Sequence, residues 1–199
     1  KGTDPEKRSA IILKSMSEQS DRVRLIPVLA KTGGREALAT VLKEFENGDV
    51  PMWEACFKAL TSWTDYSASS ALYEICASKN KTYEAPAFSG YVRQVRNAPI
   101  TDEQKLLLFR KIMPYAGSSD RQNLILTEAG KLKTYPALFF VGEYINDPAT
   151  AATAAKSAMY IALPSVDQKA GMYGTKVREI LSKAITESKG QESDYNKEM

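Results

Sequence analysis

The chain has 199 residues, 43% of them hydrophobic and 26% charged, which is ordinary for a globular protein long enough to bury a continuous core. Its formal net charge of +3 is too small to indicate a phosphate-binding surface, and it does not imply acidic substrates either. The absence of histidine excludes the usual general base at neutral pH, Ser-His and Cys-His nucleophile pairs and His-based zinc sites.

Apolar residues recur at helical spacing through the first half of the chain, and turn residues separate the stripes. These stripes predict helices over residues 3–16, 20–31, 35–46, 51–63, 68–78 and 85–97. Thr3 or Asp4 is expected to cap the first helix, with Glu6 reaching back to complete a capping box. Pro27 lies inside the second predicted helix and is expected to bend it, because proline removes a backbone hydrogen bond.

The second half has the same plan. Its stripes predict helices over residues 101–113, 119–132, 136–145, 151–162 and 165–185. Thr101 and Gln104 have the spacing of a capping box at the first of these helices. Ser165 and Gln168 are expected to open the last helical region. Five alanines predict a face that a neighbouring helix approaches closely: Ala151, Ala154, Ala155, Ala158 and Ala162.

The two halves resemble each other at a separation of about a hundred residues. The stretch 124–163 repeats the stretch 25–60, and the matches include Asp21-Arg22 on Asp120-Arg121, Ala37-Leu38 on Ala137-Leu138 and Ala59 on Ala158. No segment alternates apolar and polar residues for long enough to predict a strand. We therefore expect an all-α fold, an α-solenoid of about 10–11 helices in antiparallel pairs. It would form one domain, 1–199, of two similar halves, 1–99 and 100–185, with a polar tail or linker, 186–199.

Two segments carry a resemblance to a known repeat family. Residues Tyr135–Pro148, followed by the alanine-rich helix to Ala162, resemble a HEAT-like repeat, in which an Asp-Pro turn joins a leucine-striped helix to an alanine-lined one. Residues 37–60 resemble the same unit, with Asn47-Gly48-Asp49 at the turn. The resemblance covers most of the chain and implies an α-solenoid.

A narrower resemblance is to the HEAT-like regions that accompany domains of the 3-keto-disaccharide hydrolase type in secreted bacterial multidomain proteins. Residues 87–93, 103–105 and 124–147 carry it. It implies a non-catalytic scaffold or protein-interaction module within a larger, exported, glycoside hydrolase-like protein, located in the periplasm or at the cell surface. The implied partner is an adjoining domain of the same chain, with carbohydrate reached through that domain.

The sequence alone leaves the compartment open. No apolar run approaches the roughly 20 residues of a membrane-spanning helix. The chain begins with a polar segment and no recognisable signal peptide, which is compatible with a mature or excised piece and does not exclude the cytoplasm. Two cysteines, Cys56 and Cys76, are too few for a disulfide framework. They are either two buried small hydrophobic residues or one disulfide.

Candidate binding residues come from the second helix of each predicted pair, because these helices form the concave face of a solenoid. Lys58, Arg93 and Lys156 are expected there. Tyr91, Arg93 and Arg96 interleave an aromatic ring with two cations, which indicates either contacts to a sugar or a nucleic-acid backbone, or a packed tyrosine beside exposed arginines.

Evidence for catalysis in the sequence is weak. Glu54, Asp65 and Glu74 are carboxylates of the kind that a glycosidase pairs, but their spacing does not require them to converge, and the alternative is that they are solvated helix-surface charges. Gly33-Gly34 is a helix stop rather than a phosphate loop, because no GK[ST] follows. We expect no enzymatic activity, metal or cofactor in this domain.

The alternative function is nucleic-acid binding of the kind found in HEAT-like bacterial alkylpurine DNA glycosylases, which grip DNA with a basic concave surface. The mild net charge of +3 argues against it, so nucleic acid is not the expected partner. The catalytic carboxylate and groove-facing aromatic residues of that family cannot be matched to positions in this sequence.

Overall fold

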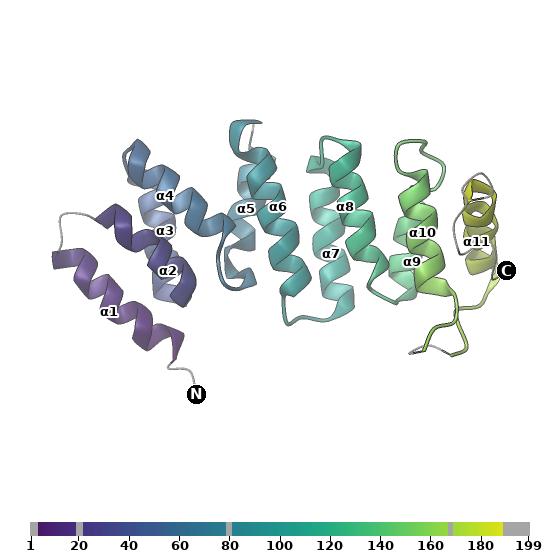
Figure 1. The fold of residues 1–199 in the computed structure, drawn as a ribbon, viewed down its shortest axis with the longest axis horizontal. Coiled ribbons are helices and arrows are strands. Elements are labelled where there is room, and N and C mark those ends of the chain that lie inside the picture. The colour runs from purple at the N-terminus through teal and green to yellow at the C-terminus, as the bar shows by residue number, and fades with distance from the viewer. Residues whose placement is uncertain (1–3, 19–21, 79–80, 167–168, 189–199) are drawn as a thin grey trace. The chain divides into compact units, whose positions relative to one another are not determined.

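The computed structural model describes residues 4–18, 22–78, 81–166 and 169–188 (Figure 1). Every regular element within these ranges is helical, so the predicted all-α class is confirmed. None of the described helices combines the length and the hydropathy that crossing a bilayer requires.

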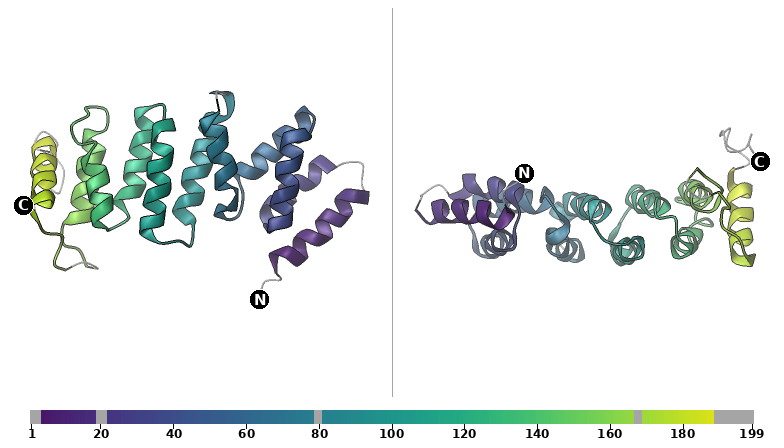
Figure 2. Two further views of the ribbon diagram at one scale, coloured as in Figure 1. Left: turned by 180° about the vertical axis from the view of Figure 1, so that it is seen from behind. Right: turned by 90° about the horizontal axis from the view of Figure 1, so that it is seen from below.

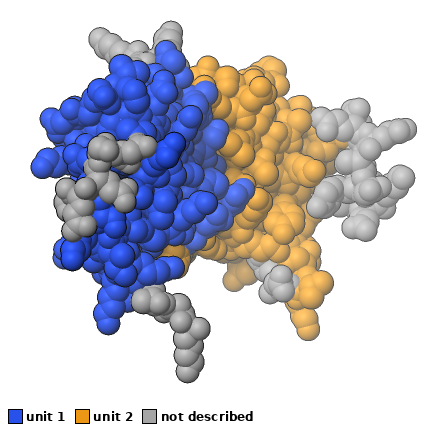
Figure 3. All heavy atoms as spheres, turned by 60° about the vertical axis from the view of Figure 1, so that its left-hand side comes forward, with its two compact units in different colours: residues 1–98 blue, residues 99–199 orange. Residues whose placement is uncertain are grey.

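The chain divides into two compact units, Lys1–Ala98 and Pro99–Met199, which Figure 3 colours separately. The boundary lies one residue from the position that the internal repeat predicts. Each unit has its own set of fully buried large side chains, including Trp63 and Phe88 in unit 1 and Phe109 and Leu138 in unit 2.

Unit 1 contains six α-helices and two short 3₁₀ helices in its described residues. They are α1 (Pro5–Glu18), η1 (Arg22–Leu25), α2 (Ile26–Thr32), α3 (Arg35–Asn47), α4 (Val50–Thr61), η2 (Tyr66–Ala68), α5 (Ser69–Ala77) and α6 (Lys81–Asn97). Consecutive helices pair, α3 with α4 and α5 with α6, and α4 also packs against α6 and α2 (Figure 2). The apolar stripe predicted for α4 is correct, since Cys56, Ala59 and Leu60 are buried.

Unit 2 is described through five α-helices and one 3₁₀ helix. They are α7 (Asp102–Ile112), η3 (Met113–Tyr115), α8 (Ser119–Gly130), α9 (Tyr135–Gly142), α10 (Ala151–Ala162) and α11 (Thr175–Ser188). The predicted capping box is present at α7, where the Gln104 backbone N–H donates to Thr101 and the Gln104 side chain accepts from the Thr101 backbone.

The alanine face of α10 is buried, as the sequence predicts, and it packs against α8, α9 and α11. Ser157 on α10 lies so close to Gly130 on α8 that a Cβ added at Gly130 would come within 2.9 Å of the Ser157 Cβ. The small residues therefore permit a close approach between α8 and α10.

Three local predictions are wrong. Pro27 does not bend a helix: a 3₁₀ turn ends at Leu25, and α2 starts at Ile26 with the proline in its first turn, where it loses no helical hydrogen bond. Helix α6 starts at Lys81 rather than near Ala85, and it contains Pro86 without interruption. The last helix starts at Thr175, because residues 169–174 form turns and irregular backbone.

Glu6 also differs from its predicted role. Its carboxylate does not reach back to its own helix: Oε1 accepts a hydrogen bond from the backbone N–H of Arg35 at 2.7 Å and so caps the start of α3, while Asp4 Oδ1 accepts from the Glu6 N–H. Of the other predicted start and tail residues, Thr3, Ser20, Asp21, Gln168 and 189–199 lie outside the described residues.

Candidate functional site

The predicted lysines are exposed, one in each unit. Lys58 lies on α4 and Lys156 on α10. Neither lines a pocket of the described residues that we consider below.

The predicted aromatic and cationic group lies on α6, where two of its members make contacts within unit 1. Tyr91 is only 1% exposed, and burial, with smaller contributions from Tyr73 and Cys76, raises the pKa of its hydroxyl above the ordinary range. The Arg93 Nη2 donates to the backbone oxygens of Thr61 at 2.6 Å and Trp63 at 3.5 Å, where α4 ends. A basic side chain at this position satisfies carbonyls that have no partner within their own helix. The packed-tyrosine interpretation of this group is therefore the correct one for Tyr91.

Arg96, the third member of the group, is exposed on α6. Its Nε donates to the Asn97 Oδ1 at 3.4 Å. The ring of Tyr91 lies inside the unit, so the three side chains do not form one aromatic and cationic surface.

The three carboxylates named from the sequence have separate environments. Glu54 is exposed on α4, and Asp65 caps η2 by accepting the Ser67 N–H at 2.8 Å. Only Glu74 lines one of the pockets described here. None of the three pockets described here brings two of these carboxylates together.

Both cysteines are buried thiols. Burial, followed by the nearby Glu44 carboxylate, raises the pKa of the Cys56 thiol to about 11. A neutral buried thiol is a poor nucleophile, so Cys56 belongs to the core.

Unit 1 has a groove of about 530 Å³ between α3 and α5, which we call the aromatic groove. Its lining includes Leu42, Phe45 and Glu46 from α3, Trp53 from α4, Ala71, Glu74 and Ile75 from α5, and Tyr83 from α6. Ser67 of η2, Ser70 of α5 and Ser78 at the end of α5 complete the wall. The groove forms because α4 and α6 pack together while α3 and α5 lie on either side of it.

Trp53 is the centre of the aromatic floor. Its ring stacks on Phe45 at a centroid distance of 5.0 Å and on Phe57 at 5.6 Å, and it meets Tyr83 edge-on at 4.3 Å. Such pairs add to the stabilisation from burial alone. The floor is therefore a contiguous aromatic cluster centred on Trp53.

The charge of the aromatic groove is entirely negative. Glu46 stands on the α3 side and Glu74 on the α5 side, both exposed, and no lysine or arginine is among the described residues that line it. Neither carboxylate has an ion-pair partner in the described part of unit 1. An apolar surface between two carboxylates suits a ligand with an apolar side chain flanked by cations.

Unit 2 has a groove at the corresponding place in the repeat, with a different lining. It measures about 510 Å³ and is lined by Ile145, Asn146, Ala151, Lys183 and other residues of the 145–151 segment and α11. At a shift of 100 residues, Phe45 corresponds to Ile145 and Glu46 to Asn146. The unit 2 groove has no aromatic lining residue and carries both a lysine, Lys183, and a glutamate, Glu187, so the aromatic lining without a cation is found only in the unit 1 groove of these two.

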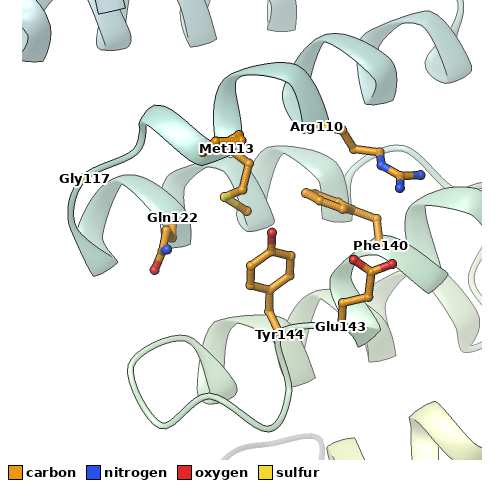
Figure 4. A pocket seen from close by; sticks show the side chains of 8 residues that line it. Arg110, Met113, Gly117, Gln122, Phe140, Glu143 and Tyr144 are labelled. Carbon is orange, nitrogen blue, oxygen red and sulfur yellow. The ribbon is translucent and has the colours of Figure 1, made fainter. Parts of the chain in front are cut away.

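A third, smaller and more polar pocket lies wholly within unit 2, between α7, η3, α8 and α9 (Figure 4). It has a volume of about 340 Å³, and its polar side chains are Arg110, Gln122, Glu143 and Tyr144. We call it the Tyr144 pocket. None of the sequence-predicted binding residues belongs to it.

Comparison with protein-family models, with curated proteins and with solved structures finds no match to this chain.

The sequence contained part of the signal for the aromatic groove. Trp53 and Phe57 are spaced i and i+4 on α4, apart from the buried stripe of Cys56 and Leu60, which indicates a second apolar face. The sequence did not predict that Tyr83 lines the groove, because Pro86 suggested that helix α6 begins only after Tyr83. For the Tyr144 pocket there was no local signal, since its polar residues come from two helices, α7 and α8, and from the turn after α9.

Proposed function

We propose that this chain is a non-catalytic helical binding module of the HEAT-like kind, an α-solenoid that holds a peptide segment of a partner protein in the aromatic groove. The pairing of consecutive helices, with α4 against α6 in one unit and α8 against α10 in the other, supports the repeat interpretation. In line with the sequence resemblance, the partner is a segment of an adjoining domain, and the parent protein is exported and carbohydrate-related.

The observation that carries the proposal is the aromatic groove itself. Phe45, Trp53 and Tyr83 present apolar surface that the unit leaves half-buried, and helices on either side define a channel for a side chain. Grooves between helices that are lined by apolar and aromatic residues are a common mode of peptide recognition. The flanking Glu46 and Glu74 select a segment with lysine or arginine beside its apolar anchor.

Nucleic-acid binding is not favoured by any of these contacts. Tyr91 is buried and Arg93 binds carbonyls of its own unit, so two of the three residues that suggested it are engaged elsewhere. Acidic side chains at the groove would repel a phosphate backbone.

Fluorescence anisotropy with labelled ten-residue peptides tests the proposal. One peptide has a central leucine flanked by lysines, and the matched peptide has glutamates in place of the lysines. We expect the lysine peptide to bind with a Kd of roughly 1–100 µM and the glutamate peptide to bind at least tenfold more weakly. Failure of every peptide with an apolar anchor, whatever its charge, would refute the proposal.

Two arginine substitutions distinguish the groove from the general surface. Ala71→Arg places a long side chain in the groove, whereas Ala10→Arg adds the same charge at an exposed position of α1 outside the three pockets. We expect Ala71→Arg to abolish binding of the lysine peptide and Ala10→Arg to leave it within twofold. Equal loss in both variants would indicate non-specific electrostatic binding instead.

A further inference from the structure

The Tyr144 pocket is independent of the aromatic groove and has the size and lining of a small-molecule site. Its volume of about 340 Å³ falls within the range of ligand pockets. Helix α7 contributes Arg110, α8 contributes Gln122, and α9 with the turn after it contributes Phe140, Glu143 and Tyr144. Three elements therefore position its groups.

Two opposite charges border the pocket without neutralising each other. Figure 4 shows the Arg110 guanidinium and the Glu143 carboxylate at the same side of the pocket, next to the Phe140 ring. The guanidinium carbon lies 5.9 Å from the centre of that ring. No ion pair joins Arg110 to Glu143 or to any other residue in the described part of unit 2. Both charges remain available to a ligand.

The inner part of the pocket combines neutral polar atoms with apolar surface. The Tyr144 ring packs edge-on against Phe140 at 5.4 Å, and its hydroxyl points toward Met113 in Figure 4. Burial and then Glu143 raise the pKa of this hydroxyl, against a smaller lowering by Arg110, so it stays protonated and can donate a hydrogen bond. Gln122 adds an amide, and Met113 and Phe140 add apolar surface.

We propose that the Tyr144 pocket binds a small zwitterion of the α-amino acid class. Its carboxylate would pair with the Arg110 guanidinium, which can hold it bidentately, and its ammonium with the Glu143 carboxylate. In an α-amino acid these two groups are attached to one carbon, which matches two unpaired, opposite charges at one side of a pocket. The ligand side chain then extends toward Met113, Gln122 and the Tyr144 hydroxyl.

Isothermal titration calorimetry on the full 199-residue chain with three probes of the same shape tests this. The probes are L-leucine, which has both charges, L-leucinamide, which lacks the carboxylate, and 4-methylpentanoate, which lacks the ammonium. We expect leucine to bind with a Kd of about 0.1–1 mM and each analogue to bind at least tenfold more weakly. No binding by any probe, or an analogue that binds within threefold of leucine, would overturn the proposal.

Matched substitutions locate the binding. Arg110→Gln and Glu143→Gln should each weaken leucine binding by roughly tenfold or more, and Tyr144→Phe by a smaller factor. Arg178→Gln on α11 and Glu103→Gln on α7 remove the same charges at exposed positions outside the pocket and should change the affinity less than twofold. Circular dichroism checks that each variant is folded, and equal effects at pocket and control positions would contradict the assignment. Because the aromatic groove lies in unit 1, failure here leaves the proposed peptide binding untouched.

Discussion

Gly34 has a backbone conformation that other residues rarely adopt, with φ of +100° just before α3. An added Cβ would also lie 3.1 Å from the Glu6 Oε2 and 3.2 Å from the Ser9 Oγ. Since the other Glu6 oxygen caps α3 through the Arg35 N–H, displacement of Glu6 would cost that cap as well. We therefore expect Gly34→Ala to lower the free energy of unfolding by roughly 2–4 kcal/mol in urea denaturation.

Gly174 provides the control, because it also has a positive φ, of +127°, but an added Cβ would meet no atom within 4 Å. Gly174→Ala should show backbone strain alone, about 1 kcal/mol. If the two substitutions lower the free energy of unfolding by the same amount, crowding of the added Cβ against Glu6 and Ser9 contributes nothing to the loss.

Cys56 makes the stability of unit 1 sensitive to alkaline pH. Its thiol pKa is raised from 9.0 to about 11. Between these values the unfolded chain loses the proton and the folded chain keeps it, so the stabilisation present below pH 9 is lost as the pH rises toward 11. Relative to Cys56→Ala, the wild type should lose roughly 1–3 kcal/mol over this window in denaturation curves. Parallel pH profiles for the two proteins would contradict the assignment.

Some residue roles could be predicted from the sequence and others could not. Tyr91 lies at i+3 from Phe88 and i−4 from Val95, so its inward position follows from the stripe that correctly places those two residues in the core. The role of Arg93 depends on the carbonyls of Thr61 and Trp63, about thirty residues earlier in the chain. No local pattern encodes that contact.

Among the helices, α7 has the start that the sequence specifies most completely. The Thr101 hydroxyl accepts from the Gln104 N–H at 3.3 Å, and the Thr101 N–H donates to the Gln104 Oε1 at 3.0 Å. Thr101→Ala should therefore cost about 0.5–2 kcal/mol in thermal or urea unfolding. Thr127→Ala, an exposed mid-helix change on α8, should be neutral or slightly stabilising, and a cost as large as that of Thr101→Ala would argue against the cap.

At the contact between α8 and α10, replacing Gly130 by alanine has two opposite effects: it raises the helix propensity of α8 and crowds Ser157 on α10. Alanine is a better helix former than glycine by about 1 kcal/mol, but at Gly130 its Cβ would lie 2.9 Å from the Ser157 Cβ and 3.3 Å from the Ser157 Cα. Because that neighbour is a packed helix rather than a flexible side-chain end, packing should prevail, and Gly130→Ala should destabilise by about 1–3 kcal/mol.

A double-mutant cycle separates the two effects. Ser157→Gly removes the opposing Cβ, so in that background Gly130→Ala should become neutral or stabilising, giving an interaction energy above about 1 kcal/mol. If the free-energy changes of the two substitutions are additive, the close approach of Ser157 does not determine which side chain is tolerated at position 130.

Helix boundaries were predictable where a cap or a glycine defines them, as at Thr101 and Gly33-Gly34. They were wrong where proline was taken to bend or delay a helix: Pro27 lies in the first turn of α2, where a missing N–H costs little, and α6 continues through Pro86, which lies inside it. Helix α11 starts later than predicted because Gly171 and Gly174 have positive φ angles, which are incompatible with a right-handed helix.

For the whole molecule, the internal repeat predicts one domain of two similar halves that meet within one residue of the boundary between the compact units, but it does not predict how the side chains of the units differ. Equivalent positions in the two grooves hold Phe45 and Glu46 in unit 1 and Ile145 and Asn146 in unit 2. A repeat conserves the backbone plan, whereas binding depends on side chains that converge from several helices. The aromatic groove and the Tyr144 pocket therefore emerge only once the helices are packed.

Tryptophan fluorescence of the intact chain tests the proposed peptide-binding function most directly. The chain has two tryptophans: Trp63 is fully buried, while Trp53 lies in the aromatic groove and reports its occupancy. Titration with the lysine-flanked leucine peptide should shift the emission saturably in the wild type and leave the Trp53→Phe variant unchanged. Absence of a saturable shift, or the same shift in Trp53→Phe, would contradict binding at this groove.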